Sequence, residues 1–310
     1  MQNNYKPEGR LFGTAENTEY IKSEAGLRLA SQIGKTLEGV CVSCDKSLDL
    51  KVDLCGYTGI IPYDKAVYSA DGENIKDIAV ISRVGKPVCF KVEGFANDGG
   101  EKRALLSRAE AQRECIDNYL SYLLPGDIID CRVTHTEKFG AFCDIGCGIP
   151  ALLPIDRISV SRISHAKDRL RCGDDLRCIV SRADAEPFRI FLTLREMLGT
   201  WAENAANFSP GQTVRGVVRG VEPYGVFIEL TPNLSGLSEY REDVEPGDEV
   251  AVFIKNIDER KMKVKLVIVG KQGKAAYSPL KYYVSQDVTH IYKFIYSTDL
   301  SSKITETDFT

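Results

Sequence analysis

The sequence predicts a mainly β protein made of three tandem small barrels that are joined by amphipathic helices. The first observation is an internal repeat, in which PGDIIDCRV at 125–133 is echoed by PGQTVRGVV at 210–218. The second is that each copy contains only short apolar strands between turns rich in glycine, proline and acidic residues. No helix alternates with these strands, which excludes a doubly wound α/β fold. Five such strands in about 60 to 75 residues suit a closed Greek-key barrel, the OB-fold.

Composition narrows the class of protein. The 310 residues are 43% apolar and 27% charged, which is typical of a soluble globular protein with two or three domains. The formal net charge of −4 excludes a uniformly basic protein, so any binding of nucleic acid needs a local basic patch. We find neither the apolar run of a secretion signal nor the ~18 apolar residues of a membrane span. We therefore expect a cytoplasmic protein with no membrane partner.

The N-terminal part is predicted to be a helical extension followed by the most divergent barrel. Residues 1–33 form the extension, with a helix near 23–31 that ends before Gly34, and residues 34–108 form the first barrel. Cys41 and Cys44 have the two-residue spacing of a zinc site, but no second pair of this kind follows. Flanking valines favour a strand in which Cys41 packs inward. We expect the ten cysteines to be reduced thiols, and we predict no metal and no other cofactor.

The two better copies of the barrel are predicted over 125–195 and 210–269, with linker helices at 109–124 and 196–209. Ser107 with Glu110 and Thr193 with Glu196 match the capping box that begins a helix. Apolar residues at helical spacing follow each pair, so each helix should be about fifteen residues long. The last segment, 270–310, carries seven aromatic residues. Because disordered tails are poor in aromatics, we expect it to dock on the body.

An aromatic turn recurs in both of these copies. Phe139 and Phe142 are three residues apart, which in a regular strand would place them on opposite faces. Gly140 between them could form a bulge or a tight corner that turns both rings to one surface. Two such rings would form a platform on which each stacked base gains roughly 1–3 kcal/mol. Tyr224 and Phe227 repeat the pattern, and a role in the core is the alternative.

Charge is segregated between the same two copies. The connection 157–171 of the second copy has one acid, Asp168, against His165 and five basic residues, which are Arg157, Arg162, Lys167, Arg169 and Arg171. The corresponding connection 236–249 of the third copy has six acids against Arg241 alone. A basic run is often only a solvated face. Beside an aromatic platform it could follow the phosphates of a nucleic acid, and binding would then weaken steeply with salt.

The order of these features in 125–195 resembles the S1-type RNA-binding domain. It includes the Phe-Gly-Ala-Phe turn, a glycine-rich strand, the basic connection, a Gly-Asp strand and a final Arg-Ile-Phe-Leu-Thr-Leu-Arg. The whole chain resembles three-copy members of this family from clostridial bacteria. The similarity is close in 125–195, good in 210–269 and weak in 34–108. It implies five-stranded barrels that hold single-stranded RNA by stacking and by cationic contacts.

The resemblance also implies particular site residues. The platform positions of the family fall on the two aromatic pairs, and its basic residue on the last strand falls on Arg189 after Asp184 and on Lys263 after Asp258. In each pair, one more residue separates the aspartate from the basic residue than the family pattern implies. The full predicted RNA-binding set is Lys138, Phe139, Phe142, Arg162, His165, Lys167, Arg169, Arg189, Tyr224, Phe227, Lys255 and Lys263.

Three departures from the family pattern qualify this prediction. The histidine of the family is replaced by Pro154 in the second copy and by Glu239 in the third. In the first copy the platform positions hold Leu48 and Lys51, so we expect a packing or protein-binding module there. The second copy is therefore predicted to be the main RNA site, and the acidic connection should weaken the third.

The leading hypothesis is a non-catalytic, monomeric protein that binds single-stranded RNA, and messenger RNA in particular, in translation with the small (30S) ribosomal subunit. Only three histidines occur, and neither a phosphate-binding glycine loop nor a nucleophile elbow is present. The alternatives are an adaptor whose barrels contact protein, favoured by the acidic third copy, and a regulator of RNA turnover recruited to a nuclease.

Overall fold

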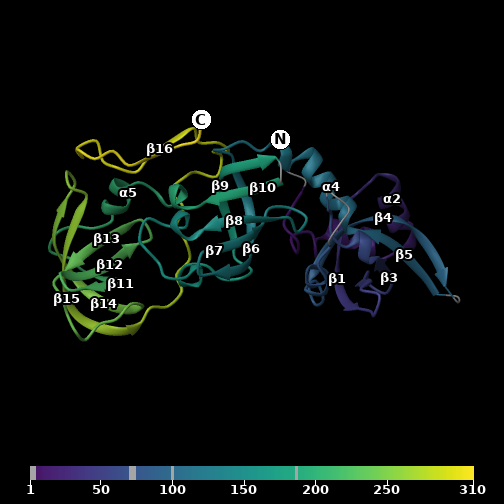
Figure 1. Cartoon of the computed structure of the whole chain (residues 1–310), viewed down its shortest axis with the longest axis horizontal. Coiled ribbons are helices and arrows are strands. Elements are labelled where there is room, and N and C mark those ends of the chain that lie inside the picture. Colours follow the sequence, from purple (N-terminus) through teal and green to yellow (C-terminus); the bar gives the residue numbers. More distant parts are fainter. Residues whose placement is uncertain (1–4, 70–74, 99–100, 186–187) are drawn as a thin grey trace. The chain divides into compact units, whose positions relative to one another are not determined.

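The computed structural model describes residues 5–69, 75–98, 101–185 and 188–310 of the chain (Figure 1). It contains three closed five-stranded barrels with one common strand order, in which the fifth strand lies between the third and the fourth. The predicted mainly β fold with three OB-type barrels is therefore confirmed. The chain divides into two compact units, Met1–Leu123 with Asp144–Pro150 and Leu124–Cys143 with Ala151–Thr310.

The first barrel follows two helices, α1 (Ala15–Ile21) and α2 (Glu24–Gln32). The second confirms the helix predicted near 23–31, and it begins where the Ser23 hydroxyl accepts a hydrogen bond from the Gly26 N–H. The first helix was missed. The barrel strands are β1 (Leu37–Cys44), β2 (Leu50–Asp53), β3 (Thr58–Ile61), β4 (Pro87–Asp98) and β5 (Glu101–Ser107), with α3 (Asp77–Ile81) before β4.

The core of this barrel explains the Cys41 and Cys44 pair. Cys41 is fully buried on β1 among leucine and valine side chains, which confirms its packing role, and Cys44 is partly exposed at the end of the strand. Seven of the ten cysteines are buried free thiols. In the ranges that the structure describes, no group of three or more His, Cys, Asp or Glu side chains could hold a metal ion.

A buried carboxyl group, that of Glu38, fixes the N-terminal segment to the first barrel. Its Oε2 atom accepts hydrogen bonds from the backbone N–H groups of Gly9, Leu11 and Phe12 at 2.7–3.1 Å. Its Oε1 atom is buried without a hydrogen-bond partner. Burial raises the pKa of Glu38 to about 7, against the effect of the three donors.

The two linkers differ in secondary structure, although their sequences predicted one amphipathic helix in each. The first forms α4 (Arg108–Asn118), which has eleven residues instead of about fifteen. Ser107 caps it by accepting from the Glu110 N–H at 3.0 Å, as predicted, but the Glu110 carboxylate binds Arg113 and does not complete the capping box. The second is not a helix of fifteen residues. It consists of a 3-10 helix (Arg195–Leu198) and the five-residue α5 (Trp201–Ala205), which are separated by Gly199 at φ +84°.

The predicted cap at Thr193 was also wrong. Its hydroxyl contacts the Glu196 carboxylate instead of a backbone N–H group. The true capping box lies seven residues later, where Thr200 and Glu203 each accept a hydrogen bond from the backbone N–H of the other. The ring of Tyr283 from the C-terminal segment lies against Gly199, where a Cβ atom would be 2.7 Å from it. Any residue with a side chain would clash with the Tyr283 ring, so this interruption between the two short helices requires glycine.

The second and third barrels provide the surfaces of interest. The second has β6 (Ile128–Glu137), β7 (Gly140–Asp144), β8 (Pro150–Pro154), β9 (Asp175–Ala185) and β10 (Phe188–Thr193). The third has β11 (Thr213–Glu222), β12 (Gly225–Thr231), β13 (Leu234–Ser238), β14 (Asp248–Asp258) and β15 (Lys263–Lys274). Alternate residues of these strands fill the barrel cores, and those between them face outward.

The C-terminal segment docks on these two barrels, as its aromatic content predicts. The Arg177 guanidinium donates to backbone carbonyls between Val284 and Val288, and the Tyr296 hydroxyl donates to the Asn233 carbonyl at 2.6 Å. The segment ends in the short antiparallel pair β16 (Lys293–Ile295) and β17 (Glu306–Asp308). Among the described residues, no helix is long and apolar enough to cross a membrane.

Candidate nucleic-acid interface

The two phenylalanine rings of the second barrel lie together on its outer surface. Phe139 sits in the turn before β7 and is 55% exposed, while Phe142 lies on the strand and is partly exposed. The ring centroids are 6.0 Å apart, and the ring planes meet at 85°. The structure therefore brings the predicted pair together, with one ring edge directed at the other and ring surface open to solvent.

The backbone of this turn is fixed by hydrogen bonds on both sides. The Phe139 carbonyl accepts from the Ile155 N–H at 2.9 Å, just past β8. The Phe142 carbonyl accepts from the Thr134 hydroxyl on β6 at 3.1 Å. Both rings therefore project from a backbone that its neighbours already hold in place.

The third barrel repeats this arrangement. Tyr224 is 69% exposed in the turn before β12, and its ring centroid lies 6.0 Å from that of Phe227, with an angle of 87° between the planes. The similarity of the two barrels thus extends from the sequence repeat to the geometry of the side chains. Glu239, at the position of the family histidine, is exposed at the end of β13.

The glycine in each turn allows the backbone to pass close to a carbonyl group of the neighbouring strand. A Cβ atom on Gly140 would lie 2.3 Å from the Leu153 carbonyl oxygen, and one on Gly225 would lie 2.4 Å from that of Ser238. In the third barrel the pairing of β12 is regular at Gly225, and the register shifts lie between Val218 and Gly220 on β11 and between Glu229 and Thr231 on β12. The first ring of each pair lies outside the strand, so the alternation of faces does not apply to it.

An outward-facing row of side chains continues from the platform across each barrel. In the third barrel Phe227 lies opposite Leu237, and Leu237 lies opposite Lys265 on β15. In the second barrel Leu152 lies opposite Phe191 on β10, and Phe191 lies opposite Arg182 on β9. The Arg182 guanidinium carbon is 4.1 Å from the centroid of the Phe191 ring, a cation–π contact.

The residues Phe191, Arg182 and Lys265 were missing from the predicted set. A signal for Phe191 was present in the sequence, because Ile190 and Leu192 are apolar and alternate with Arg189 and Phe191. Since Ile190 and Leu192 are buried in the core, the other two residues must face outward. Arg182 carries no such signal, because its relation to Phe191 depends on the pairing of β9 with β10.

Each predicted last-strand basic residue pairs with an aspartate near the end of the preceding strand. Arg189 is directly opposite Asp184 across β9 and β10, and Lys263 is directly opposite Asp258 across β14 and β15. Arg189 and Lys263 are exposed, as are Lys138 beside Phe139 and Lys255 on β14.

The basic connection of the second barrel is divided between two grooves. Arg157 lines a groove together with Phe191 and Arg182. Lys167 and Arg171 line a separate groove of about 580 Å³ between the second and third barrels, and the Arg171 guanidinium stacks there on the Tyr277 ring at 4.1 Å. Only part of the basic connection therefore lies near the aromatic platform.

Two further members of the connection have local roles. His165 begins a 3-10 helix (Ala166–Asp168), and its Nδ1 atom accepts from the Lys167 N–H at 3.1 Å. Arg162 is exposed. The His165 ring edge and the Arg162 guanidinium therefore lie at the surface of the connection. Neither residue lines either of the two grooves.

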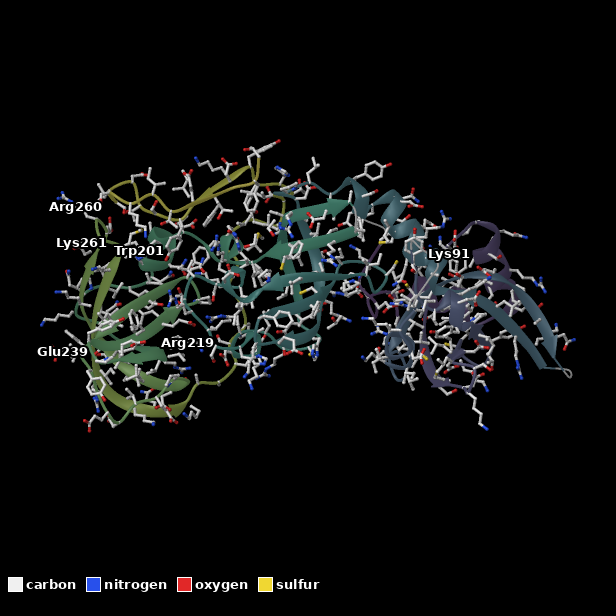
Figure 2. The ribbon with its side chains drawn as sticks, in the orientation of Figure 1. Lys91, Trp201, Arg219, Glu239, Arg260 and Lys261 are labelled. Carbon is white, nitrogen blue, oxygen red and sulfur yellow. The ribbon has the colours of Figure 1, made fainter. Side chains whose placement is uncertain are left out.

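Arg169 requires a correction, because it is buried. Its guanidinium donates two hydrogen bonds, at 2.6 and 2.7 Å, to the two carboxylate oxygens of Glu229 on β12. Arg219, labelled in Figure 2, binds the same carboxylate from β11 at 2.8 Å. This buried cluster joins the second barrel to the third, so the charge of Arg169 is not available to a phosphate.

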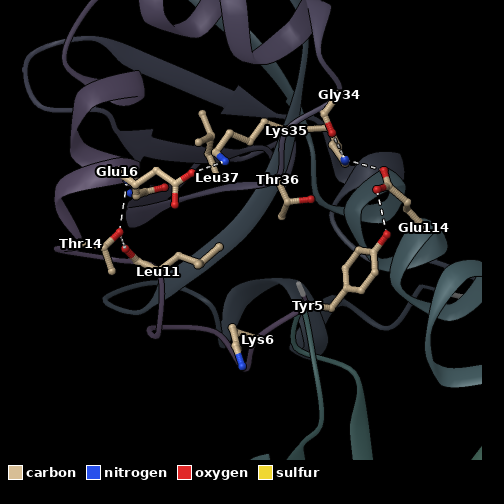
Figure 3. A pocket seen from close by; sticks show the side chains of 12 residues that line it. Tyr5, Lys6, Leu11, Thr14, Glu16, Gly34, Lys35, Thr36, Leu37 and Glu114 are labelled. Atoms are coloured by element: carbon tan, nitrogen blue, oxygen red, sulfur yellow. Dashed lines mark hydrogen bonds and ion pairs between the residues drawn. The ribbon is translucent and has the colours of Figure 1, made fainter. Parts of the chain in front are cut away.

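The first barrel has no aromatic ring at the platform positions, and its own edge-to-face pair, Tyr57 with Phe95 at 6.4 Å, packs partly buried against the core. Leu48 lies in the turn between β1 and β2 at φ +65°, and Lys51 is partly buried on β2. Its unit has a cavity of about 420 Å³ (Figure 3). Two lysines in that cavity are already paired, Lys35 with Glu16 and Lys91 with Glu114. Most of their charge is therefore neutralised locally.

Comparison with known proteins agrees with this geometry. The family model described as "S1 RNA binding domain" matches residues 123–195, the second barrel. The small ribosomal subunit protein bS1 of Staphylococcus aureus (strain COL) is 31% identical over 235 residues, which are 71% of this chain and 58% of that protein. The bS1 protein of Rhizobium meliloti (strain 1021) is 26% identical over 277 residues, which are 83% of this chain and 47% of that protein.

The chain thus spans about half the length of these curated relatives. The family match covers the barrel that has the exposed aromatic pair, the Arg182–Phe191 stack and the predicted last-strand basic residue. Through its second barrel, the chain belongs to the S1-type RNA-binding domain family.

Proposed function

We propose that the chain binds single-stranded RNA on the aromatic platform of the second barrel, with assistance from the third barrel. The observation that carries this proposal is the pair of exposed, edge-to-face rings, 6.0 Å apart, at the same place in both barrels. Every base has a π-face, so stacking on such rings depends little on base sequence. The platform itself is therefore expected to discriminate weakly between bases.

Cationic side chains beside the rings supply the second part of the affinity. Lys138 adjoins Phe139 in the turn, and Arg182 and Arg189 lie on neighbouring outward positions of the same barrel. Contacts of this kind neutralise phosphates and release counterions, so affinity should fall as salt rises. In the third barrel Lys255, Lys263 and Lys265 play this part, opposed by the acidic connection that contains Glu239.

We infer that this binding serves translation in the cytoplasm, without catalysis, as a monomer that helps messenger RNA onto the small ribosomal subunit. The support is the similarity to two proteins named as small ribosomal subunit protein bS1.

The platform is tested with the double substitution Phe139→Ala/Phe142→Ala. Binding of a ten-nucleotide uridine strand, measured by fluorescence anisotropy at two salt concentrations, should weaken at least about tenfold, since each lost stack removes roughly 1–3 kcal/mol. The salt dependence should stay the same, because no charge is removed.

A matched control is Phe12→Ala/Tyr122→Ala, which removes two exposed aromatic rings from the other unit. It should leave the affinity unchanged. Circular dichroism should show that both variants are folded. Equal affinity of the wild type and the Phe139/Phe142 variant would rule out the platform.

A further inference from the structure

A groove of about 510 Å³ lies between the second barrel and the C-terminal strand β17. One wall comes from the barrel and carries Arg157, Arg182, Phe191 and Arg195. The other wall comes from β17 and carries Glu306 and Asp308. A volume of this size is typical of sites that hold one small ligand.

The groove continues the platform. Phe191 and Arg182 belong to the outward row that runs from Leu152 on β8 across β10 and β9. Arg182 is 61% exposed while its guanidinium lies 4.1 Å above the Phe191 ring, so the free face of this planar group is open. Unpaired bases stack on arginine planes as well as on aromatic rings. A strand that leaves the phenylalanine pair along this row therefore reaches the groove.

The barrel wall is cationic. Arg157 is partly exposed at the end of a 3-10 helix (Ile155–Arg157), and its contact with Asp156 is long, at 3.8 Å. Arg195 is bound by Glu196 at 2.9 Å, and Arg182 pairs with Asp184 at 3.2 Å. The side chains of Arg157 and Arg182 are the more exposed ones of this wall, so they have the most surface open to a phosphate. A guanidinium is well suited to this role because it binds phosphate oxygens in pairs.

The opposite wall is anionic and held in place. Thr307 and Phe309 face the body: the Thr307 hydroxyl donates to the Glu196 carboxylate at 2.8 Å, and Phe309 is buried. The alternate residues Glu306 and Asp308 are exposed, and Glu306 is bound by Lys293 of β16 at 2.9 Å. The Oδ1 atom of Asp308 accepts hydrogen bonds from the N–H and the hydroxyl of Thr310, at 2.9 and 2.6 Å. The carboxylates thus line the groove from a strand that is fixed by its own contacts.

We propose that this groove is a nucleotide subsite at the end of the platform, selective for a base that presents N–H donors, with guanine preferred. The inference rests on the RNA-binding function proposed above. Arg157 and Arg182 receive the phosphate, and the carboxylates of β17 accept hydrogen bonds from the base edge.

The hydrogen-bonding groups of the bases explain why guanine is preferred over uracil. Guanine carries N1–H and N2–H side by side, which match the two oxygens of a carboxylate. Uracil presents one N–H between two carbonyl oxygens, and a carboxylate repels these. The groove therefore adds one selective position to a platform that otherwise stacks any base.

The test compares two ten-nucleotide strands, one of uridines only and one with a single central guanosine, by fluorescence anisotropy with the full chain. A strand held mainly by stacking can shift along the platform, so the guanosine can reach the groove from one position. The wild type should bind the guanosine strand about three- to tenfold more tightly. In Glu306→Gln/Asp308→Asn this ratio should fall to about one.

The matched control is Glu19→Gln/Asp130→Asn, which removes two exposed carboxylates that do not line the groove. It should keep the ratio of the wild type. A wild-type ratio near one would overturn the subsite while leaving the platform intact. Equal tightening of both strands in Glu306→Gln/Asp308→Asn would also overturn it, because β17 would then only repel RNA. Binding of neither strand by the wild type would overturn the proposed function itself.

Discussion

Arg169 and Arg189 carry the same charge in the same barrel, yet their surroundings give them opposite roles. Arg169 is 7% exposed and bound through two nitrogens to Glu229, so it links two barrels. Arg189 is exposed on β10. In the proposed function, a basic residue can therefore contribute to RNA binding only where its position leaves the guanidinium in solvent.

The two arginines should respond differently to substitution. Arg169→Met leaves Glu229 with Arg219 as its remaining partner and should destabilise the second unit by about 3 kcal/mol. Arg189→Gln should leave stability unchanged and weaken RNA binding a fewfold, with a shallower salt dependence. The single tryptophan, Trp201, is buried in this unit, so its fluorescence during urea unfolding measures the first effect. Equal stability of the two variants would contradict this assignment.

Glu38 gives the first unit a pH-dependent stability. Its pKa in the folded chain is about 7, because of burial, and lies above that of an unfolded glutamate near 4.3. As pH rises, the unfolded state loses this proton first, so the free energy of unfolding should fall between about pH 4.5 and pH 7 and then level off.

Substitution Glu38→Gln should reduce this slope, since an amide does not titrate. The measurement is urea unfolding at pH 5 and pH 8, followed by far-ultraviolet circular dichroism. Trp201 lies in the other unit, so the transition seen by its fluorescence should be the same with and without the substitution. A free energy of unfolding that increases from pH 5 to pH 8 in the wild type, but not in Glu38→Gln, would refute the prediction.

At the scale of the elements, the turn before β7 depends on the absence of a side chain at Gly140. Gly140→Ala would place a methyl group 2.3 Å from the Leu153 carbonyl oxygen, so the turn must move away from β8. We expect a loss of roughly 1–3 kcal/mol in stability and weaker RNA binding. Gly270→Ala on β15 is the control, because nothing lies within 4 Å of its Cβ position. Thermal unfolding that shifts equally in both variants would contradict the prediction.

The helices and strands also show which sequence patterns were sufficient to predict the structure. The repeat and the alternation of apolar residues predicted the barrels, because strand periodicity is a local property. The capping pattern at Thr193 failed, because Gly199 and the Tyr283 ring interrupt the helix that it would begin. The two aromatic pairs were predicted because the aromatic turn recurs and contains a glycine. Arg182, β17 and the burial of Arg169 were not, since they depend on strand register and on contacts between residues 60 or more positions apart.

At the scale of the whole molecule, the net charge of −4 conceals two different surfaces. The second barrel has the exposed pair with Arg157, Arg182 and Arg189 nearby, whereas the third has the acidic connection beside its own pair. We therefore expect the second barrel to dominate RNA binding.

Ribosome co-sedimentation tests the role in translation. The chain should sediment with small subunits that carry messenger RNA, and Phe139→Ala/Phe142→Ala should reduce the bound fraction severalfold. Nuclease treatment should have a similar effect. A bound fraction that survives both would favour the adaptor hypothesis, in which a barrel contacts ribosomal protein.

The hydrogen bonds from Ile155 and Thr134 to the carbonyls of Phe139 and Phe142 also have a kinetic consequence. Because the platform is already ordered, RNA does not have to wait for a rearrangement, and encounter is set by electrostatic attraction. Changes to the rings should then act mainly on how long the RNA stays bound, whereas changes to the surrounding arginines should act on how fast it arrives.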